Sequence, residues 1–332
     1  MSATKPAPSP SATMVRWAQD WRRRAREQTI ISLLILLVAL VALLDVIRPG
    51  MVSLNWISST LLYAAPLGIL AAGQTLVMLT GGIDLSVAAV ATAAGYVMAS
   101  QATAQGDARA VFFGLGIAAA VGLVNGIGVG VLRVQPLIMT LGMSLVVAGF
   151  LTVYQVLAVA SAAAVPGFVT AVGSGTSLGF IPNSLVLWVP IAALVIWGLR
   201  RSGYGRLLYA VGDNPTAARL AGVRVWEVLV VDYVLSGLLA GIAGIDLAGL
   251  TSTATIDLGN SFLLPSIAAV VIGGTSIFGG RGGYGGSIVG ALILTVLVSL
   301  LTIIDAPEPF RQVLYGAIIL GVAAAYTRVV NE

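Results

Sequence analysis

Long apolar runs separated by short polar or glycine-rich breaks make up most of the chain. A helix that crosses a bilayer needs about 20 consecutive apolar residues, because the hydrocarbon core is about 30 Å thick. By this length the sequence predicts ten spans, although the third and eighth runs are short or broken, so the range is eight to eleven. The runs lie near residues 30–47, 59–80, 85–100, 110–132, 137–159, 184–200, 227–250, 262–278, 284–304 and 311–328. We therefore expect an all-α integral membrane protein with about ten transmembrane helices and glycine-broken segments.

The N-terminal segment differs in composition from the rest. Residues 1–29 begin with a Pro-, Ser- and Ala-rich stretch and continue with five arginines, which predicts a disordered, basic cytoplasmic tail. The first apolar run, 30–47, ends in DVIRPG and offers no small-residue cleavage site, so we interpret it as a retained span and not as a signal peptide. Residues 30–330 are expected to form one transmembrane domain.

The distribution of positive charge predicts an orientation. With the N-terminus in the cytoplasm and ten spans, the inner segments hold 14 of the 17 Lys and Arg residues. The outer segments hold only Arg48, Arg109 and Arg311. Such an excess of positive charge inside is typical of membrane proteins, so both termini are expected in the cytoplasm of a bacterium, with the chain in its inner membrane. The net charge of +4 is explained by this topology and predicts no nucleic-acid partner.

Composition narrows the chemistry further. Only 9% of the residues are charged, against about 25% in soluble domains. The chain has no His and no Cys, which excludes zinc, haem, iron–sulfur and disulfide chemistry and any nucleophile activated by imidazole. We expect no catalytic residue, metal or bound cofactor. Lys5 is the only lysine and lies in the tail, so the chain lacks a Gly-Lys-Ser/Thr phosphate loop. If ATP drives this protein, another polypeptide must bind it.

The longest charged insertion after the tail is the cytoplasmic loop 200–227, RRSGYGRLLYAVGDNPTAARLAGVRVWE. Asn214 suits a helix N-cap, Pro215 the first helical position, and Gly222 the left-handed residue past the end. These signals predict a helix over residues 215–221. So short a helix is not stable alone in water, and its small apolar face, with Ala217, Leu220 and Ala221, suits docking into a groove of another protein. A loop folded without a partner remains the alternative.

Two segments carry paired glycines inside apolar runs. Gly81-Gly82 precedes Asp84 in residues 73–95, and Gly273-Gly274 precedes Thr275 in residues 266–293. Corresponding breaks in two halves of a transporter point to its transport path, because unwound backbone at membrane depth must face protein or water. The candidate path residues are Gln74, Gly81, Gly82, Asp84, Ser86, Asn125, Gly273, Gly274 and Thr275. Close helix packing at the glycines, and capping by Asp84 of a helix that begins at Leu85, are the alternatives.

Two acidic residues fall in the run 227–250. At about 1.5 Å per residue, Asp232 is expected near the inner interface of the membrane and Asp246 near the outer one. Carboxylates deep in a membrane suggest proton or ion relays. Their expected positions near the interfaces make an ion-coupled transporter the weaker alternative.

The loop also resembles a known family. The segment YAVGDNPTAARLAGV is similar to the coupling loop of ABC-importer permeases, with Thr216 where many members have Glu, followed by Ala217, Ala218 and Gly222. The resemblance implies that this helix sits in a cleft of an ATPase subunit and transmits its closure. The implied coupling residues are Asn214, Pro215, Thr216, Ala217, Ala218, Arg219, Leu220, Ala221 and Gly222.

A second resemblance is more specific. The strings GGIDLS (81–86) and IGGTSIFGGRGG (272–283), with VQPLIMTLGMSLVVAGF (134–150) and SGLLAGIAGI (236–245), resemble the ribose-type permeases of carbohydrate ABC importers, relatives of the ribose, xylose and galactoside permeases. The resemblance covers roughly residues 60–325. It implies about ten spans, a permease dimer of identical or paralogous chains, separate ATPase subunits, and a periplasmic binding protein that delivers a neutral monosaccharide.

One departure limits the substrate. Leu264-Pro265 stands where ribose permeases often carry an acidic residue, so the resemblance does not specify ribose. Another small solute, such as a polyol, an autoinducer-type sugar or a branched-chain amino acid, is the alternative. The sister family for branched-chain amino acids lacks the GGIDLS string, which favours a sugar.

Overall fold

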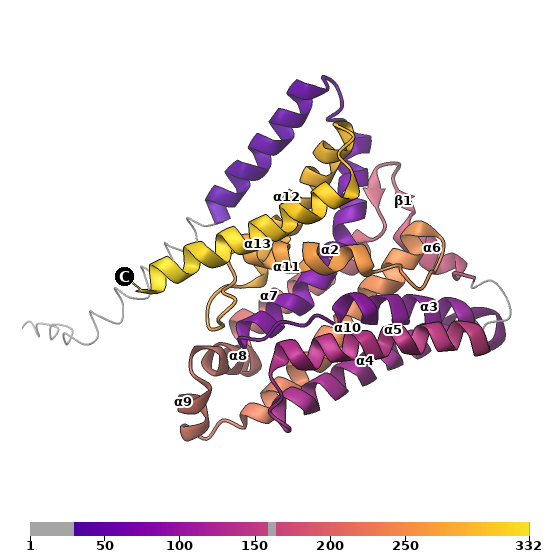
Figure 1. Cartoon of the computed structure of the whole chain (residues 1–332). Helices are drawn as coiled ribbons and strands as arrows, with labels where there is room; N and C mark the ends of the chain where they lie inside the picture. The colour runs from indigo at the N-terminus through magenta and orange to yellow at the C-terminus, as the bar shows by residue number, and fades with distance from the viewer. Residues whose placement is uncertain (1–29, 159–163, 332) are drawn as a thin grey trace, which may run out of the picture.

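The computed structural model describes residues 30–158 and 164–331, so the predicted tail 1–29 lies outside the described residues (Figure 1). Helices account for most of the described chain. They are Ile30–Ile47, α2 (Leu54–Leu79), α3 (Val87–Gln105), α4 (Asp107–Gly130), α5 (Pro136–Ala158), α6 (Gly167–Gly173), α7 (Leu185–Arg201), α8 (Gly203–Asp213), α9 (Pro215–Leu220), α10 (Val225–Thr251), α11 (Leu263–Ile272), α12 (Tyr284–Ile303) and α13 (Glu308–Asn331). A 3₁₀ turn covers Asn260–Phe262, and strands β1 (Thr176–Ser177) and β2 (Ile181–Pro182) pair antiparallel.

Within the described residues, six helices are long and apolar enough to cross a membrane: Ile30–Ile47, α2, α4, α5, α10 and α12. A seventh results if α7 and α8, which meet at 70°, form one bent span. The chain is therefore an all-α multi-pass membrane protein. Each of the ten predicted segments lies on a helix, but α11 has only 10 residues and is about 15 Å long, too short to cross the bilayer alone.

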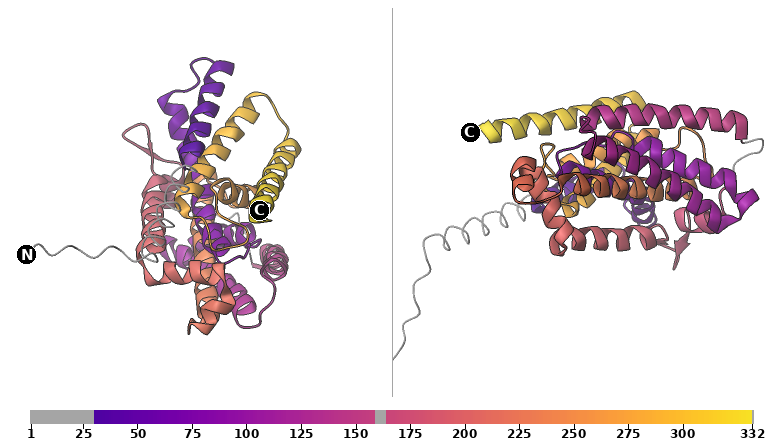
Figure 2. Two further views of the ribbon diagram at one scale, coloured as in Figure 1. Left: turned by 90° about the vertical axis from the view of Figure 1, so that its left-hand side faces the viewer. Right: turned by 90° about the horizontal axis from the view of Figure 1, so that it is seen from below.

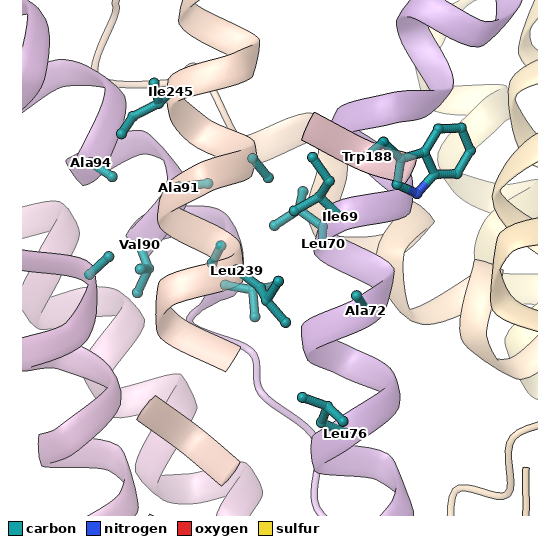
Figure 3. Close-up of a cluster of buried hydrophobic side chains, with 14 of the residues drawn as sticks. Ile69, Leu70, Ala72, Leu76, Val90, Ala91, Ala94, Trp188, Leu239 and Ile245 are labelled. Atoms are coloured by element: carbon teal, nitrogen blue, oxygen red, sulfur yellow. The ribbon is translucent and has the colours of Figure 1, made fainter. Parts of the chain in front are cut away.

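The core explains why α3 is less apolar than a typical span. Almost every residue of α3 from Val87 to Ala99 is buried inside the protein. Figure 3 shows Val90 and Ala91 of α3 beside Leu239 of α10, with Leu70 of α2 on the other side. Since α3 is surrounded by protein, its alanine-rich sequence can be less apolar than that of a lipid-facing helix. By contrast, Ile30–Ile47 and α5 expose most of their apolar side chains, as lipid-facing helices do.

A stripe of small residues joins α4 to α10. It recurs at every fourth position of α4, at Ala118, Gly122, Gly126 and Gly130, whereas Gly114, one turn earlier, packs against Ala94 of α3. A Cβ atom added at Gly126 would lie 2.7 Å from the Cα of Val230, so the two backbones are in contact there. Small residues at this spacing let membrane helices approach closely.

The two ends of the molecule carry different features. Helix α9 and the C-terminal end of α13 lie at one end of the bundle, on the left in Figure 1. The β1–β2 hairpin and α6 lie at the opposite end, as Figures 1 and 2 agree.

Candidate functional site

Helix α9 begins at a well-formed cap. The Asn214 side-chain oxygen accepts hydrogen bonds from the backbone N–H groups of Thr216, at 3.0 Å, and Ala217, at 2.9 Å. Pro215 follows at the first helical position, where no N–H is needed. The sequence prediction of this helix start is confirmed.

The end of α9 is closed by a Schellman motif. The Val223 N–H donates to the Ala218 carbonyl and the Gly222 N–H to the Arg219 carbonyl, both at 3.0 Å. Gly222 has a φ of +85°, which favours glycine, as predicted. The helix ends at Leu220, one residue earlier than expected, and Ala221 is its C-cap.

The two faces of α9 differ in exposure. Ala218 is buried against the rest of the protein, whereas the Leu220 side chain is 85% exposed. Thr216, Ala217, Arg219 and Ala221 are exposed as well. After α9, Arg224 pairs with Glu227 at 2.8 Å, and this carboxylate raises the pKa of Arg224. The helix is thus fixed at both ends and on one face, and its apolar Leu220 side chain is exposed.

The first glycine break follows α2, which ends at Leu79. The side-chain amide of Gln74, in α2, reaches across the break to the backbone of Asp84. Its Nε2 donates to the Asp84 carbonyl at 2.6 Å, and its Oε1 accepts from the Asp84 N–H at 3.3 Å. The Gln74 side chain thus satisfies both backbone groups of Asp84, which lies outside any helix or strand.

A buried network surrounds the Asp84 carboxylate. Its Oδ1 accepts from the Ser86 backbone N–H at 3.0 Å and from the Ser86 hydroxyl at 2.6 Å. Its Oδ2 accepts from the Ser236 hydroxyl of α10 at 2.9 Å. Asn125 of α4 donates to the Ser86 hydroxyl at 2.8 Å. The structure therefore joins Gln74, Asp84, Ser86 and Asn125 in one network, all fully buried.

Two details of this network differ from the sequence interpretation. Asp84 does not cap a helix that begins at Leu85, because α3 begins at Val87. The Asp84 side chain instead forms an Asx turn, in which its Oδ1 accepts from the Ser86 N–H two residues later. Ser236 was missed, since a lone serine in the small-residue run SGLLAGIAG gives no signal of its own.

The second glycine break follows α11, which ends at Ile272. Gly274 has a φ of +82° and turns the chain, and the Thr275 N–H then bonds to the Val270 carbonyl at 3.1 Å. The buried Thr275 hydroxyl accepts from the Gly283 N–H at 3.3 Å, so it braces its own loop and lies apart from the Asp84 network.

The two breaks meet each other. The Gly280 N–H, in the loop after the second break, donates to the Leu79 carbonyl at 3.0 Å. A Cβ atom at Gly279 would lie 2.9 Å from the Gly81 nitrogen. The two glycine-broken segments are therefore in direct backbone contact, which the sequence analysis did not predict.

The two carboxylates of α10 are both buried. Asp232 accepts a hydrogen bond from the Thr80 hydroxyl at 3.0 Å. Asp246 accepts none from the described part of the chain. Fourteen residues separate them along the helix, or about 21 Å.

Comparison with known proteins decides the family. A family model described as the branched-chain amino acid transport system / permease component matches residues 56–323, which is most of the chain. The chain belongs to this permease family. It is a transport component and not an enzyme.

Similar permeases cover nearly the same length. The chain is 36% identical over 296 residues to the ribose import permease protein of Escherichia coli strain K12, spanning 86% of this chain and 90% of that one. It is 34% identical over 297 residues to the fructose import permease protein of Rhizobium meliloti, with 87% and 82% covered. It is 38% identical over 263 residues to the galactofuranose transporter permease protein of Escherichia coli strain K12, with 77% and 75% covered. No solved structure matches this permease.

Proposed function

We propose that this permease is the membrane-spanning subunit of an ATP-binding-cassette importer in a bacterial inner membrane, and that it translocates a neutral monosaccharide. The observation that carries the proposal is α9. It is a short, capped helix that exposes Leu220 at one end of the bundle, in a chain that lacks a phosphate loop of its own.

The sugar class rests on the relatives. The matching family model is named for branched-chain amino acids, but the ribose, fructose and galactofuranose permeases align over three quarters or more of the chain. The GGIDLS string, which the amino-acid branch lacks, favours the same class. The alternative substrates are a polyol, an autoinducer-type sugar or a branched-chain amino acid.

The proposed assembly has two permease chains, identical or paralogous, two ATPase subunits and a periplasmic binding protein. The residues of the ATPase-coupling surface are those of α9 and its caps, Asn214 to Gly222. The whole of residues 30–330 acts as one transmembrane domain of about ten spans, with both termini and the loop 200–227 in the cytoplasm. The placement of α9 and the end of α13 at one end of the bundle agrees with this orientation (Figure 1).

The substrate path is proposed to pass the two glycine breaks. Its candidate groups are Gln74, Asp84, Ser86 and Asn125 beside the first break, and Thr275 beside the second. In this conformation these side chains are bonded and buried, so a sugar would reach them after α3 separates from α10. Gly81, Gly82, Gly273 and Gly274 supply the flexible backbone.

Site-specific crosslinking tests the coupling surface. The chain has no cysteine, so Leu220→Cys places a single thiol on α9. We expect this thiol to capture the ATPase subunit. Leu178→Cys is the matched control, because Leu178 is 83% exposed on the hairpin at the opposite end. Capture by Leu178→Cys, or none by Leu220→Cys, contradicts the proposal.

Two further substitutions, in α9 and just past its C-cap, test the coupling function. Arg219→Glu reverses a charge on the exposed side of α9, and Gly222→Val forces a β-branched residue into a left-handed conformation. Both variants should insert into the membrane but separate ATP hydrolysis from sugar uptake. Normal uptake by both would exclude α9 as the coupling surface.

A further inference from the structure

The helices on either side of α9 both reach the first glycine break. Helix α8 ends at Asp213, so only Asn214 separates it from α9, and α10 begins at Val225, four residues after Ala221. Because a single residue links α8 to α9, a displacement of α9 must also displace the end of α8.

Helix α8 contacts the breaks through its last turn. A Cβ atom at Gly212 would overlap the Leu79 carbonyl oxygen, so only glycine fits against the end of α2. Gly279, in the loop that follows the second break, faces Gly212, because a Cβ atom at Gly279 would lie 2.8 Å from the Gly212 carbonyl oxygen. One turn earlier, the Tyr209 hydroxyl donates to the Gly282 carbonyl at 2.9 Å. Helix α8 therefore touches both breaks at once, backbone against backbone.

Helix α10 is bonded to both sides of the first break. The Thr80 hydroxyl, before Gly81-Gly82, donates to Asp232 at 3.0 Å. The Ser236 hydroxyl donates to Asp84, after the glycines, at 2.9 Å. Asp232 and Ser236 are four residues apart and so lie on one face of α10. The helix thus holds the break at two points, one on each side of its flexible glycines.

We infer that Gly212 and the Thr80–Asp232 pair are positioning residues that pass the movement of α9 to the two glycine breaks. Helix α8 moves both breaks together through the Gly212 contact. Helix α10 moves the first break through Thr80 and Ser236. The inference rests on the proposed function, since it requires that an ATPase moves α9.

The contacts differ in kind, and this allows two independent tests. Gly212→Ala inserts a methyl group between α8 and Leu79 and should force the two apart. Gly203→Ala is its matched control in the same helix, because the added Cβ atom would meet only the flexible end of Arg206, at 3.7 Å. Thr80→Val removes the hydroxyl that binds Asp232 and keeps the shape of the side chain, whereas Thr80→Ser keeps the hydroxyl.

The measurement is sugar uptake per ATP hydrolysed, in proteoliposomes that contain the complete transporter and its binding protein. We expect Gly212→Ala and Thr80→Val to lower this ratio by about tenfold, within the range of coupling between sites in other proteins. Gly203→Ala and Thr80→Ser should keep the wild-type ratio. Each variant is also made in the Leu220→Cys chain, where capture of the ATPase should persist.

The outcomes separate the inference from the proposed function. If Gly212→Ala and Thr80→Val capture the ATPase but keep the wild-type ratio, the inference is wrong and the proposed function stands. The inference is equally wrong if uptake and hydrolysis fall in parallel, since the contacts then only hold the fold. If the Leu220→Cys chain itself captures no ATPase, the proposed function fails first.

Discussion

The Trp188 indole donates its N–H to the Tyr284 hydroxyl at 2.9 Å, and this hydroxyl donates in turn to the Gly68 carbonyl at 2.7 Å. These two bonds join α7, α12 and α2 at a point where all three groups are buried. A Cβ atom at Gly68 would overlap the Trp188 ring, so the three helices are also in close contact there. The hydroxyl is the centre of a three-helix joint.

Removal of that hydroxyl should weaken the joint. Tyr284→Phe leaves the Trp188 N–H and the Gly68 carbonyl without a partner in an apolar site, at a cost of about 1 kcal/mol or more. We expect a lower apparent melting temperature of the detergent-solubilised protein, measured by size-exclusion chromatography after heating. Tyr63→Phe, on a side chain that is 57% exposed, is the control and should behave as wild type.

The Asp84 network gives a second prediction. Asp84→Ala leaves the hydroxyls of Ser86 and Ser236 without their acceptor, and each unsatisfied buried group costs about 1–3 kcal/mol. Asp84→Asn keeps one acceptor and offers Ser236 a donor. We expect the amount of folded permease in the membrane to fall strongly in Asp84→Ala and less in Asp84→Asn. The exposed Asp257→Ala should have no effect, and equal loss in all three variants would contradict the prediction.

The N-cap of α9 can be tested with two substitutions of Asn214, one that removes the capping oxygen and one that keeps it. Asn214→Ala removes the acceptor for two backbone N–H groups and should destabilise the start of the helix by about 0.5–2 kcal/mol. Because α9 has only six residues, we expect a large drop in crosslinking from Leu220→Cys to the ATPase. Asn214→Asp retains a capping oxygen and should preserve it. Loss of capture in both variants would point to a contact with the partner and not to capping.

The α4–α10 seam predicts a position effect among glycines of one helix. Gly122→Val places its side chain into the Tyr233 carbonyl of α10 and should cost about 1–3 kcal/mol from overpacking. Gly116→Val, two turns away, meets nothing within 4 Å. Folded yield in the membrane should therefore fall for Gly122→Val alone, and equal yields would show that the seam is less tight than described.

Topology can be measured on single-cysteine chains. Ser177→Cys on the hairpin should react with a membrane-impermeant maleimide added to intact cells with a permeable outer membrane. Ala217→Cys on α9 should react only after the inner membrane is opened. Reaction of both from the same side would contradict the proposed orientation of the loop 200–227.

The sequence predicted the positions of the helices better than the contacts between them. Asn214, Pro215 and Gly222 were sufficient for α9, because caps and left-handed residues act within a few positions of the chain. The apolar runs located every long helix for the same local reason. The contact of Gly280 with Leu79 could not be predicted, since glycine carries no side chain that reveals its neighbour.

The candidate polar residues show the same division. Gln74, Asp84 and Ser86 lie within one short stretch, and their grouping was visible in the sequence. Ser236 joins them from a helix 150 residues away, and only the packing of α10 against α2 and α3 brings it there. Thr275 shares a sequence context with Asp84 but braces a separate loop.

The small-residue stripe of α4 has a mechanical consequence. Where two backbones touch along most of their length, neither helix can slide or rotate against the other without collision, so α4 and α10 must travel as a single stiff rod. Relative movement of helices is then left to the other helix pairs of the bundle. Helix α10 begins four residues after the C-cap of α9, so, if an ATPase moves α9 as proposed, the rod would carry that movement toward the opposite end of the bundle.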